Sequence, residues 1–184
     1  KPHGRGHLFG PGRPDGPLPE HYEPWESPVS NPMSSQQNNP AIVLWETAPR
    51  GSRAQYPIMA TTHRLVEHMN NGILTRHMGW LVEMMPEMFI EISQELAAEK
   101  GIGNGNSIIV ESARGSITGK AMVTMRIKPV HQNGSKVHYI CLPWNWGYMG
   151  PSKGSITNSL TARVVDPNTG IPEFRSFLCN VRGA

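Results

Sequence analysis

The chain has 184 residues, 38% of them hydrophobic, which suits one domain of ordinary size or one domain with a long irregular arm. Its 17 basic residues exceed its 14 acidic residues by only three, and they neither form a Lys/Arg run nor alternate with aromatic residues. This charge pattern argues against a nucleic-acid-binding surface and leaves a small anionic ligand possible.

The cysteines and the apolar runs exclude several further classes of protein. Cys141 and Cys179 are the only cysteines and form no C-x-x-C pair, so thiolates cannot assemble an iron–sulfur cluster or a structural zinc site here. No apolar stretch approaches the roughly 20 residues of a membrane-spanning helix, so we expect no direct membrane span. The chain does not begin with Met, as expected of a piece of a longer protein.

Residues 1–40 are rich in Gly, Pro, Ser and Asn and follow neither the period of a helix nor that of a strand. We therefore divide the chain into an extended arm, 1–40, and a folded domain, 41–184. The arm keeps large apolar residues spaced as anchors on a partner surface would be: Leu8, Phe9, Leu18, Tyr22 and Trp25. A disordered tail is the alternative.

Apolar runs predict two strands after the arm, at 41–46 and 55–62, and the second ends in a cluster of polar residues. The sequence Asn-Asn-Gly at 70–72 predicts a turn. A short helical piece follows, and Pro86 ends it because proline lacks the backbone N–H that a helix needs.

Residues 88–93 alternate as a strand does, and Ser93 then provides the N-cap of a helix that Gly101 ends. The glycine-rich segment 101–107 has some likeness to a phosphate-binding loop. It lacks the P-loop lysine and leaves a helix instead of entering one, so a turn is the favoured interpretation.

Residues 106–129 predict a hairpin in which alternate side chains share one face. The apolar face would consist of Ala121, Val123, Met125 and Ile127. A second tight turn at 133–134 precedes a strand at 136–143, and the last strand is expected at about 177–181. Many short strands with one clear helix favour a compact β-barrel with helices at its edges.

The segment TTHRLVEH, residues 61–68, brings polar and charged side chains to the end of a predicted strand, where ligands are often bound. A metal site is disfavoured, since the H-E-x-x-H pattern is absent and the spacing would put the two histidines on different sides of a helix. The segment can instead supply donors to a flat, polar or anionic ligand. In the alternative interpretation, Arg64 and Glu67 form a surface ion pair and the threonines pair with a neighbouring strand.

Residues 143–150, PWNWGYMG, place three aromatic residues and two glycines between a strand and a loop. Such a stretch either covers the ring system of a ligand or fills a corner of the core. The chain has neither a G-x-S-x-G elbow nor a recognisable Ser-His-Asp or Cys-His order. We therefore nominate no catalytic residue.

Six stretches, in order, resemble the C-terminal end of the large subunit of molybdenum- or tungsten-dependent formate dehydrogenases. They are LPEHYEPWESP, TTHRLVEH, EMFIEISQELAAEKGIGNGNSIIVESARGSI, PWNWGY, TNSLT and IPEFRSFLCNV. The resemblance covers nearly the whole chain and is strongest to the respiratory, membrane-associated members. Each stretch is weak on its own, whereas the ordered combination is highly specific.

The resemblance implies a mainly β chain with a few helices, folded as a double-psi β-barrel of the type found in formate dehydrogenases and dimethyl sulfoxide reductases. It also implies that the barrel closes over a molybdopterin guanine dinucleotide, of which such enzymes carry two per metal. The cofactor-binding positions carried over are Thr61, Thr62, His63, Arg64, Glu67, His68, Asn145, Trp146, Asn158 and Arg175. Pterin edges and a pyrophosphate need many fixed donors and few proton shuttles, which fits these residues.

This chain departs from the family at two of these positions. Relatives usually have His-Trp-Gly where this chain has Asn-Trp-Gly at 145–147, so Asn145 replaces a histidine. They have Lys where this chain has Arg175. An amide still donates and accepts hydrogen bonds, although it replaces a ring.

The family's metal-ligating cysteine or selenocysteine, its catalytic His and Arg, and its four-cysteine motif do not occur in this chain. The resemblance thus implies that the full subunit is an oxidoreductase of anaerobic respiration and electron transfer, with molybdenum or tungsten and a 4Fe-4S cluster bound by other domains. We expect this chain alone to be inactive and to ligate no metal.

The partners implied are the remaining domains of the same large subunit and an iron–sulfur electron-transfer subunit, at the periplasmic face of a membrane complex or, alternatively, in the cytoplasm. The arm is expected to wrap a surface of those domains and to be loose in the isolated chain. Two other functions stay open, namely the same domain in another molybdopterin oxidoreductase and a free-standing β-barrel binding module.

Overall fold

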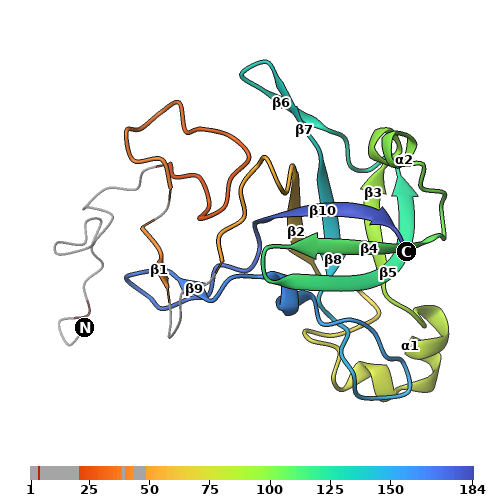
Figure 1. The fold of residues 1–184 in the computed structure, drawn as a ribbon. Coiled ribbons are helices and arrows are strands. Elements are labelled where there is room, and N and C mark those ends of the chain that lie inside the picture. Colours follow the sequence, from red (N-terminus) through yellow and green to blue (C-terminus); the bar gives the residue numbers. More distant parts are fainter. Residues whose placement is uncertain (1–3, 5–20, 39, 44–48) are drawn as a thin grey trace.

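A computed structural model describes residue 4 and residues 21–38, 40–43 and 49–184. Within these residues, six strands close into a barrel in the order β10-β2-β8-β3-β5-β4 (Figure 1). The strands are β2 (Ile58–His63), β3 (Phe89–Ser93), β4 (Ser107–Ser112), β5 (Gly115–Thr124), β8 (Tyr139–Pro143) and β10 (Phe177–Gly183). A mainly β chain with a closed barrel confirms the predicted fold class and is consistent with a double-psi β-barrel.

The barrel mixes parallel and antiparallel pairs. β2 runs parallel to β8 and β3 runs parallel to β5, while the other neighbours are antiparallel. Side chains alternate between the interior and the outside of a barrel, so every second residue of these strands enters the core. The largest fully buried core residues on the strands include Ile58, Ile90, Ile92, Ile108, Ile140, Leu142 and Leu178.

Helix α2 (Gln94–Lys100) forms as its sequence predicts. Ser93 Oγ accepts a hydrogen bond from the Leu96 N–H at 3.1 Å, and Gly101 ends the helix in the left-handed conformation with φ of 63°. Leu96 and Ala97 are buried in the barrel core, so the helix closes one edge of the barrel. The following segment to Asn106 is a turn, as the sequence favours, because Asn106 Oδ1 accepts a hydrogen bond from the Gly103 N–H at 2.8 Å.

A small helical lobe follows β2 at the lower end of the barrel (Figure 1). It contains the 3-10 helix η1 (Thr75–His77) and helix α1 (Gly79–Met84), which stops before Pro86 as predicted. The turn that leads into the lobe is also confirmed, with positive φ at Asn70 and Gly72. No residue of α1 is buried within the part of the chain that the structure describes.

The remaining short strands depart partly from the predictions. β1 (Ile42–Val43) pairs with β9 (Val164–Val165), and the rest of the predicted strand 41–46 lies largely outside the described residues. The strand predicted at 136–143 is divided at His138 into β7 (Ser135–Val137) and β8. β7 forms a hairpin with β6 (Val130–Gln132) through the predicted turn at 133–134, whose two residues both have positive φ.

The prediction of a shared apolar face along residues 106–129 is wrong beyond Thr124, where β5 ends. Met125 is exposed, whereas Ile127 is buried outside the strand. The alternation fails because β5 ends at Thr124 and the backbone bends at residues 125–126. The last 3-10 helix, η2 (Thr157–Leu160), lies over β5 and precedes β9.

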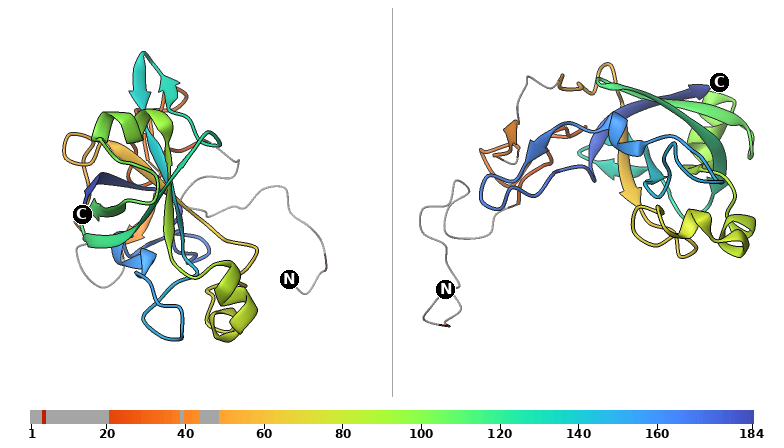
Figure 2. Two further views of the ribbon diagram at one scale, coloured as in Figure 1. Left: turned by 90° about the vertical axis from the view of Figure 1, so that its right-hand side faces the viewer. Right: turned by 90° about the horizontal axis from the view of Figure 1, so that it is seen from below.

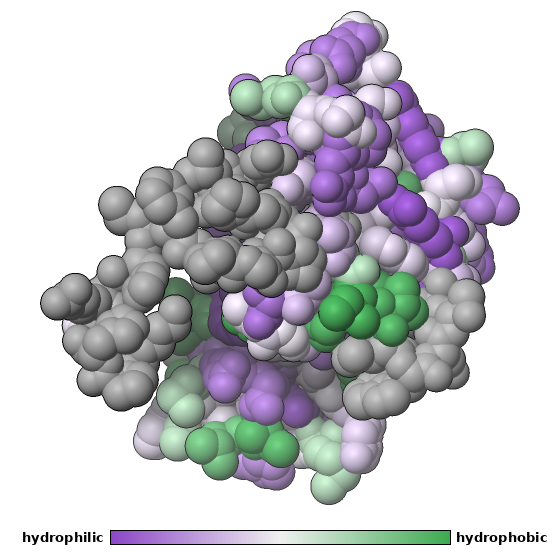
Figure 3. Space-filling model, turned by 90° about the vertical axis from the view of Figure 1, so that its left-hand side faces the viewer, coloured by the Kyte–Doolittle hydropathy of each residue, from purple (hydrophilic) through white to green (hydrophobic). Residues whose placement is uncertain are grey.

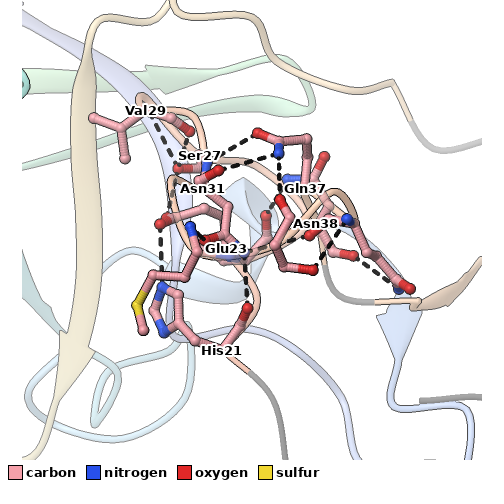
Figure 4. A network of polar contacts seen from close by, with 11 residues as sticks. His21, Glu23, Ser27, Val29, Asn31, Gln37 and Asn38 are labelled. Carbon is pink, nitrogen blue, oxygen red and sulfur yellow. Dashed lines mark hydrogen bonds and ion pairs between the residues drawn. The ribbon is translucent and has the colours of Figure 1, made fainter. Parts of the chain in front are cut away.

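Residues 21–38 of the arm fold on themselves through polar contacts, which Figure 4 shows from close by. Asn31 donates from its side chain to the His21 carbonyl oxygen at 2.7 Å, and its backbone N–H donates to Gln37 Oε1 at 2.9 Å. Others labelled in this network are Glu23, Ser27, Val29 and Asn38.

Glu26 joins this part of the arm to the barrel. Its carboxylate is 1% exposed and accepts hydrogen bonds from the Arg114 guanidinium and from the backbone N–H groups of Gly51 and Leu178. The expectation of a loose arm is therefore wrong for residues 21–38, because Glu26 needs these donors when it is removed from water. Figure 2 shows this segment beside β1 and β9, at the end of the molecule opposite α1.

Three of the five expected anchors, Leu8, Phe9 and Leu18, lie outside the described residues. Trp25 packs within this chain, with the Arg50 guanidinium 5.4 Å from the centre of its ring. The division of the chain at 40/41 stays a prediction. None of the helices in the described ranges has the length and apolar character of a membrane span.

Candidate functional site

A cavity of about 490 Å³ lies where the helical lobe meets the loop that follows β8. Figures 1 and 2 show these two segments side by side at the lower end of the barrel. The lining residues come from three segments of the chain and are Asn70, Asn71, Ile73, Arg76, Trp144, Trp146, Gly147, Tyr148, Met149, Ile156 and Asn158. Two predicted cofactor-binding residues, Trp146 and Asn158, are thus brought to one cavity.

Arg64 and Trp144 form a stack at one side of this cavity. The Arg64 guanidinium lies 4.1 Å from the centre of the Trp144 ring, and Trp144 stacks on Phe174 with ring centres 4.8 Å apart and 26° between the planes. Within residues 49–184, Arg64 and Glu67 form no ion pair, so the surface-pair alternative is not supported. A guanidinium held against a ring is oriented for its remaining donors to contact a ligand.

Arg175 and Asn158 are both exposed, and of the two only Asn158 lines the cavity. Arg175 directly follows Phe174, whose ring stacks on Trp144. Asn158 lies on η2, which is tied to the end of β8 because Thr157 Oγ1 donates to the Pro143 carbonyl oxygen at 2.7 Å. The Asn158 side chain forms no hydrogen bond within the described residues and remains available to a ligand.

The two tryptophans of residues 143–150 take the two roles that the sequence left open. Trp144 is only partly buried and lines the cavity. Trp146 is buried in the core cluster, and its Nε1–H donates to Ser152 Oγ at 3.1 Å. The Ser152 hydroxyl in turn donates to the Pro86 carbonyl oxygen at 2.5 Å. This segment therefore both fills a core corner and forms a wall of the cavity.

Asn145 and His68 lie inside the protein and position the walls of the cavity. The Asn145 amide donates to the carbonyl oxygens of His68 and Asn70 at 2.8 and 2.6 Å, and its Oδ1 accepts from the Leu65 N–H at 3.3 Å. An imidazole has only two ring nitrogens and could not make all three contacts, which gives Asn at this position a structural reason. The His68 ring packs edge-on against Trp146, with ring centres 5.1 Å apart. Direct cofactor contact by these two residues stays a prediction.

The threonines of β2 point in opposite directions, as neighbouring residues of a strand do. Thr62 is buried, and its Oγ1 has no hydrogen-bond partner within the described residues. Thr61 points outward and lines a second cavity of about 270 Å³, together with Val29 of the arm and Tyr139 of β8. The structure therefore does not place Thr61 at the larger cavity. Glu67 is partly buried in the loop after β2.

His63 ends β2 in a half-buried position. Its Nε2 lies 3.9 Å from Glu91 Oε1, and neither ring nitrogen forms a hydrogen bond within the described residues. Burial lowers the pKa of His63, while the nearby Glu91 carboxylate opposes this effect and Arg126, which is paired with Glu91, adds to it. The imidazole is thus kept neutral at pH 7.

The lowered pKa of His63 predicts how stability changes with pH. Between the folded pKa and the ordinary value of 6.5, the unfolded chain binds a proton at this position and the folded chain does not. Stability from this group should be fully present above pH 6.5 and fall as the pH drops below it. We expect urea midpoints of the wild-type chain to decrease more between pH 7.5 and 5.5 than those of His63→Asn. Equal decreases would contradict this account.

Arg76 is a site residue that the sequence analysis missed. It is buried, and its Nη1 donates to the carbonyl oxygens of Gly147, Met149 and Ser152. The sequence offers no specific signal for it, because these acceptors are backbone groups about 70 residues away in the chain. Arg76 holds the loop after β8 against the helical lobe.

Gly72 makes the approach of the two segments possible. Its φ is 75°, and a Cβ atom on this residue would lie 2.1 Å from the Asn145 carbonyl oxygen. We expect Gly72→Ala to destabilise the chain by about 1–3 kcal/mol, measured by urea unfolding, because both the backbone conformation and the contact oppose a side chain. Gly79→Ala is the matched control, since its Cβ would meet no atom within 4 Å. Equal stability of the two variants would contradict this role.

Several buried polar atoms of these segments lack a hydrogen-bond partner. Among the described residues they include Thr62 Oγ1, both ring nitrogens of His63, His68 Nδ1, Arg76 Nε and Trp144 Nε1. Buried polar groups are normally hydrogen-bonded, so unpaired atoms of this kind are expected where a ligand completes the structure. Most of these atoms can donate, which suits carbonyl and phosphate oxygens. No group of three His, Cys, Asp or Glu side chains in the described ranges could hold a metal ion.

Comparisons with known proteins agree with a ligand-binding barrel. The family model described as "Molydopterin dinucleotide binding domain" matches residues 58–178. Over its whole length, the chain is 46% identical to the formate dehydrogenase subunit alpha of Megalodesulfovibrio gigas and 42% identical to the nitrate-inducible formate dehydrogenase major subunit of Escherichia coli (strain K12). It spans 18% of the length of each of these relatives.

A solved structure shares the fold. Acetylene hydratase from Pelobacter acetylenicus matches 76% of this chain and 21% of its own chain, with a TM-score of 0.52 and 14% sequence identity. The fold of this chain is therefore shared with a solved protein at low sequence identity.

Proposed function

The chain belongs to the molybdopterin dinucleotide-binding domain family, and from this premise we propose that it holds a molybdopterin guanine dinucleotide for the interconversion of formate and carbon dioxide by a larger subunit. The molybdopterin dinucleotide follows from the family, whereas the guanine base and formate as substrate are the proposed part. The two formate dehydrogenase relatives, matched along the whole chain, support formate over other substrates.

The observation that carries the proposal is the cavity of about 490 Å³ beside the Arg64–Trp144 stack. The cofactor combines a flat heterocycle, which suits aromatic walls, with phosphates and ring carbonyls, which need fixed donors. The residues that would hold it are Arg64, Trp144, Asn158 and Arg175. Thr62 and His63 would contribute the donors that lack partners in this chain.

The residues of this chain bind and orient the cofactor, exclude water from it and move no proton in the reaction. When bound with its metal, the cofactor supplies two-electron redox chemistry, which amino-acid side chains do not provide. We propose that molybdenum or tungsten, a 4Fe-4S cluster and the groups that contact formate belong to other domains. This chain alone is then inactive.

The remaining domains of the subunit are the first partner, because the relatives are several times longer than this chain. The helical lobe offers a surface for them: α1 has no buried residue, and apolar side chains there are exposed, among them Ile73, Leu74, Met78, Trp80 and Met84. Figure 3 shows apolar residues at this lower end of the molecule. An iron–sulfur electron-transfer subunit and a periplasmic location are further parts of the proposal.

The proposal is tested by the cofactor content of the native subunit that contains this chain. We expect the purified protein to release, on denaturation, a fluorescent pterin and a guanine nucleotide in equal amounts, together with molybdenum or tungsten. A subunit that carries metal and pterin without guanine would overturn the guanine dinucleotide. Full cofactor content without formate oxidation would remove formate as the substrate and leave the binding role intact.

A further inference from the structure

Arg76 has donors that the protein itself does not use. The residue is 4% exposed. Its Nη1 donates to the Ser152 carbonyl oxygen at 2.7 Å and also to the carbonyl oxygens of Met149 and Gly147. Within the described residues, Nε is buried without a partner and Nη2 donates no hydrogen bond. The guanidinium thus uses one of its two terminal nitrogens and leaves the other free.

The charge of Arg76 also lacks a partner. None of the ion pairs formed among the described residues includes it. By contrast, the Arg114 side chain, which is 9% exposed, is paired with the carboxylate of Glu26. An uncompensated buried charge is costly, and burial does lower the pKa of Arg76, yet a guanidinium stays protonated. An anion from outside this chain would remove the cost.

Arg76 is the one charged residue among the described residues that line the cavity of about 490 Å³. The other polar side chains of its wall are neutral amides, a tyrosine and two indoles. The cavity therefore presents a positive charge to whatever enters it, and an anionic group of the ligand would be drawn to this end.

We propose that Arg76 is the anion receptor of this cavity and binds a phosphate group of the dinucleotide while its Nη1 holds the loop at residues 147–152. The inference rests on the proposed function, because the diphosphate is part of the dinucleotide. A guanidinium forms charge-assisted hydrogen bonds with phosphate oxygens, so its free Nη2 suits this group better than a neutral carbonyl. Loop position and cofactor binding are then coupled through one side chain.

The test uses the full-length subunit, prepared without cofactor from cells that cannot make the pterin, and inorganic pyrophosphate as the probe. Pyrophosphate is expected to raise the melting temperature of the wild-type apo-subunit. In Arg76→Gln, the concentration that gives half of this effect should rise roughly tenfold or more, since a charged hydrogen-bonding partner is lost. Arg76→Lys restores a positive charge and should recover most of the response.

Ser152→Ala separates anion binding from loop position. It removes the hydroxyl between Trp146 and Pro86 but keeps the Ser152 carbonyl oxygen that Arg76 contacts, so it should respond to pyrophosphate as the wild type does. An unchanged response in Arg76→Gln, no response in the wild type, or an Arg76→Lys subunit that folds yet behaves like Arg76→Gln would each overturn the inference. Any of these results would leave the proposed function standing if the native subunit still contains its pterin and nucleotide.

Discussion

Replacing Arg64 with Ala in the full-length subunit is expected to weaken its binding of the dinucleotide in this cavity roughly tenfold or more. The change removes the guanidinium from the face of Trp144, where it lies 4.1 Å from the ring centre. A cation–π contact is worth about 0.5–2 kcal/mol and a hydrogen bond to a charged group about 1.5–3 kcal/mol, while each 1.4 kcal/mol changes affinity tenfold. Pterin fluorescence and nucleotide content of the purified protein measure the loss.

Arg53→Ala is the matched control for this experiment. Arg53 is an exposed arginine in the turn before β2, away from the cavity lining, so its removal changes the net charge equally. Trp144→Ala should reproduce the loss seen with Arg64→Ala, because it removes the ring that orients the guanidinium. An Arg64→Ala subunit with the cofactor content of Arg53→Ala would show that the stack does not contact the cofactor.

Replacing Glu26 with Ala is expected to cost the 184-residue chain about 3–5 kcal/mol of stability. The carboxylate is buried against Arg114 and also accepts from two backbone N–H groups, so its removal leaves a buried charge and two unpaired donors. The urea midpoint should fall strongly, and protease cleavage within residues 21–38 should become faster than in the wild type.

Glu99→Ala is the comparison for Glu26→Ala. Glu99 forms its ion pairs with Lys136 and His138 at the surface, where water and salt screen the charges. Its removal should change the urea midpoint little. If Glu26→Ala is as stable as Glu99→Ala, the arm is not joined to the barrel by this carboxylate.

Local parts of the fold could be predicted because a few neighbouring residues decide them. Ser93 and Gly101 fix the two ends of α2, and the Asn-Gly pair at 133–134 fixes the hairpin turn. The many short strands indicated a β-barrel, and the resemblance specified its double-psi type. The strand order could not be predicted because it depends on contacts between distant segments. Nothing near Glu26 in the sequence indicates that Arg114 is its partner.

Of the ten predicted cofactor-binding residues, Trp146 and Asn158 line the cavity of about 490 Å³, and the roles of all ten stay predictions. Arg64 stacks on Trp144, which lines the same cavity, whereas Thr61 lines another. Thr61 is separated from the buried Thr62 because adjacent residues of a strand face opposite sides. The Asn145 amide forms three hydrogen bonds with backbone groups, and no sequence motif indicates these contacts. Arg76 could not be found from the sequence, because only the folded structure shows that its charge is buried without an ion-pair partner.

The most direct test of the central claim is a structure of the assembled, cofactor-loaded subunit at a resolution that separates the pterin from the nucleotide. We predict density for one molybdopterin guanine dinucleotide in the cavity of about 490 Å³, with the Arg64 and Asn158 side chains within hydrogen-bonding distance of it. A cavity filled by side chains of another domain, with both dinucleotides bound away from Arg64 and Trp144, would contradict the account.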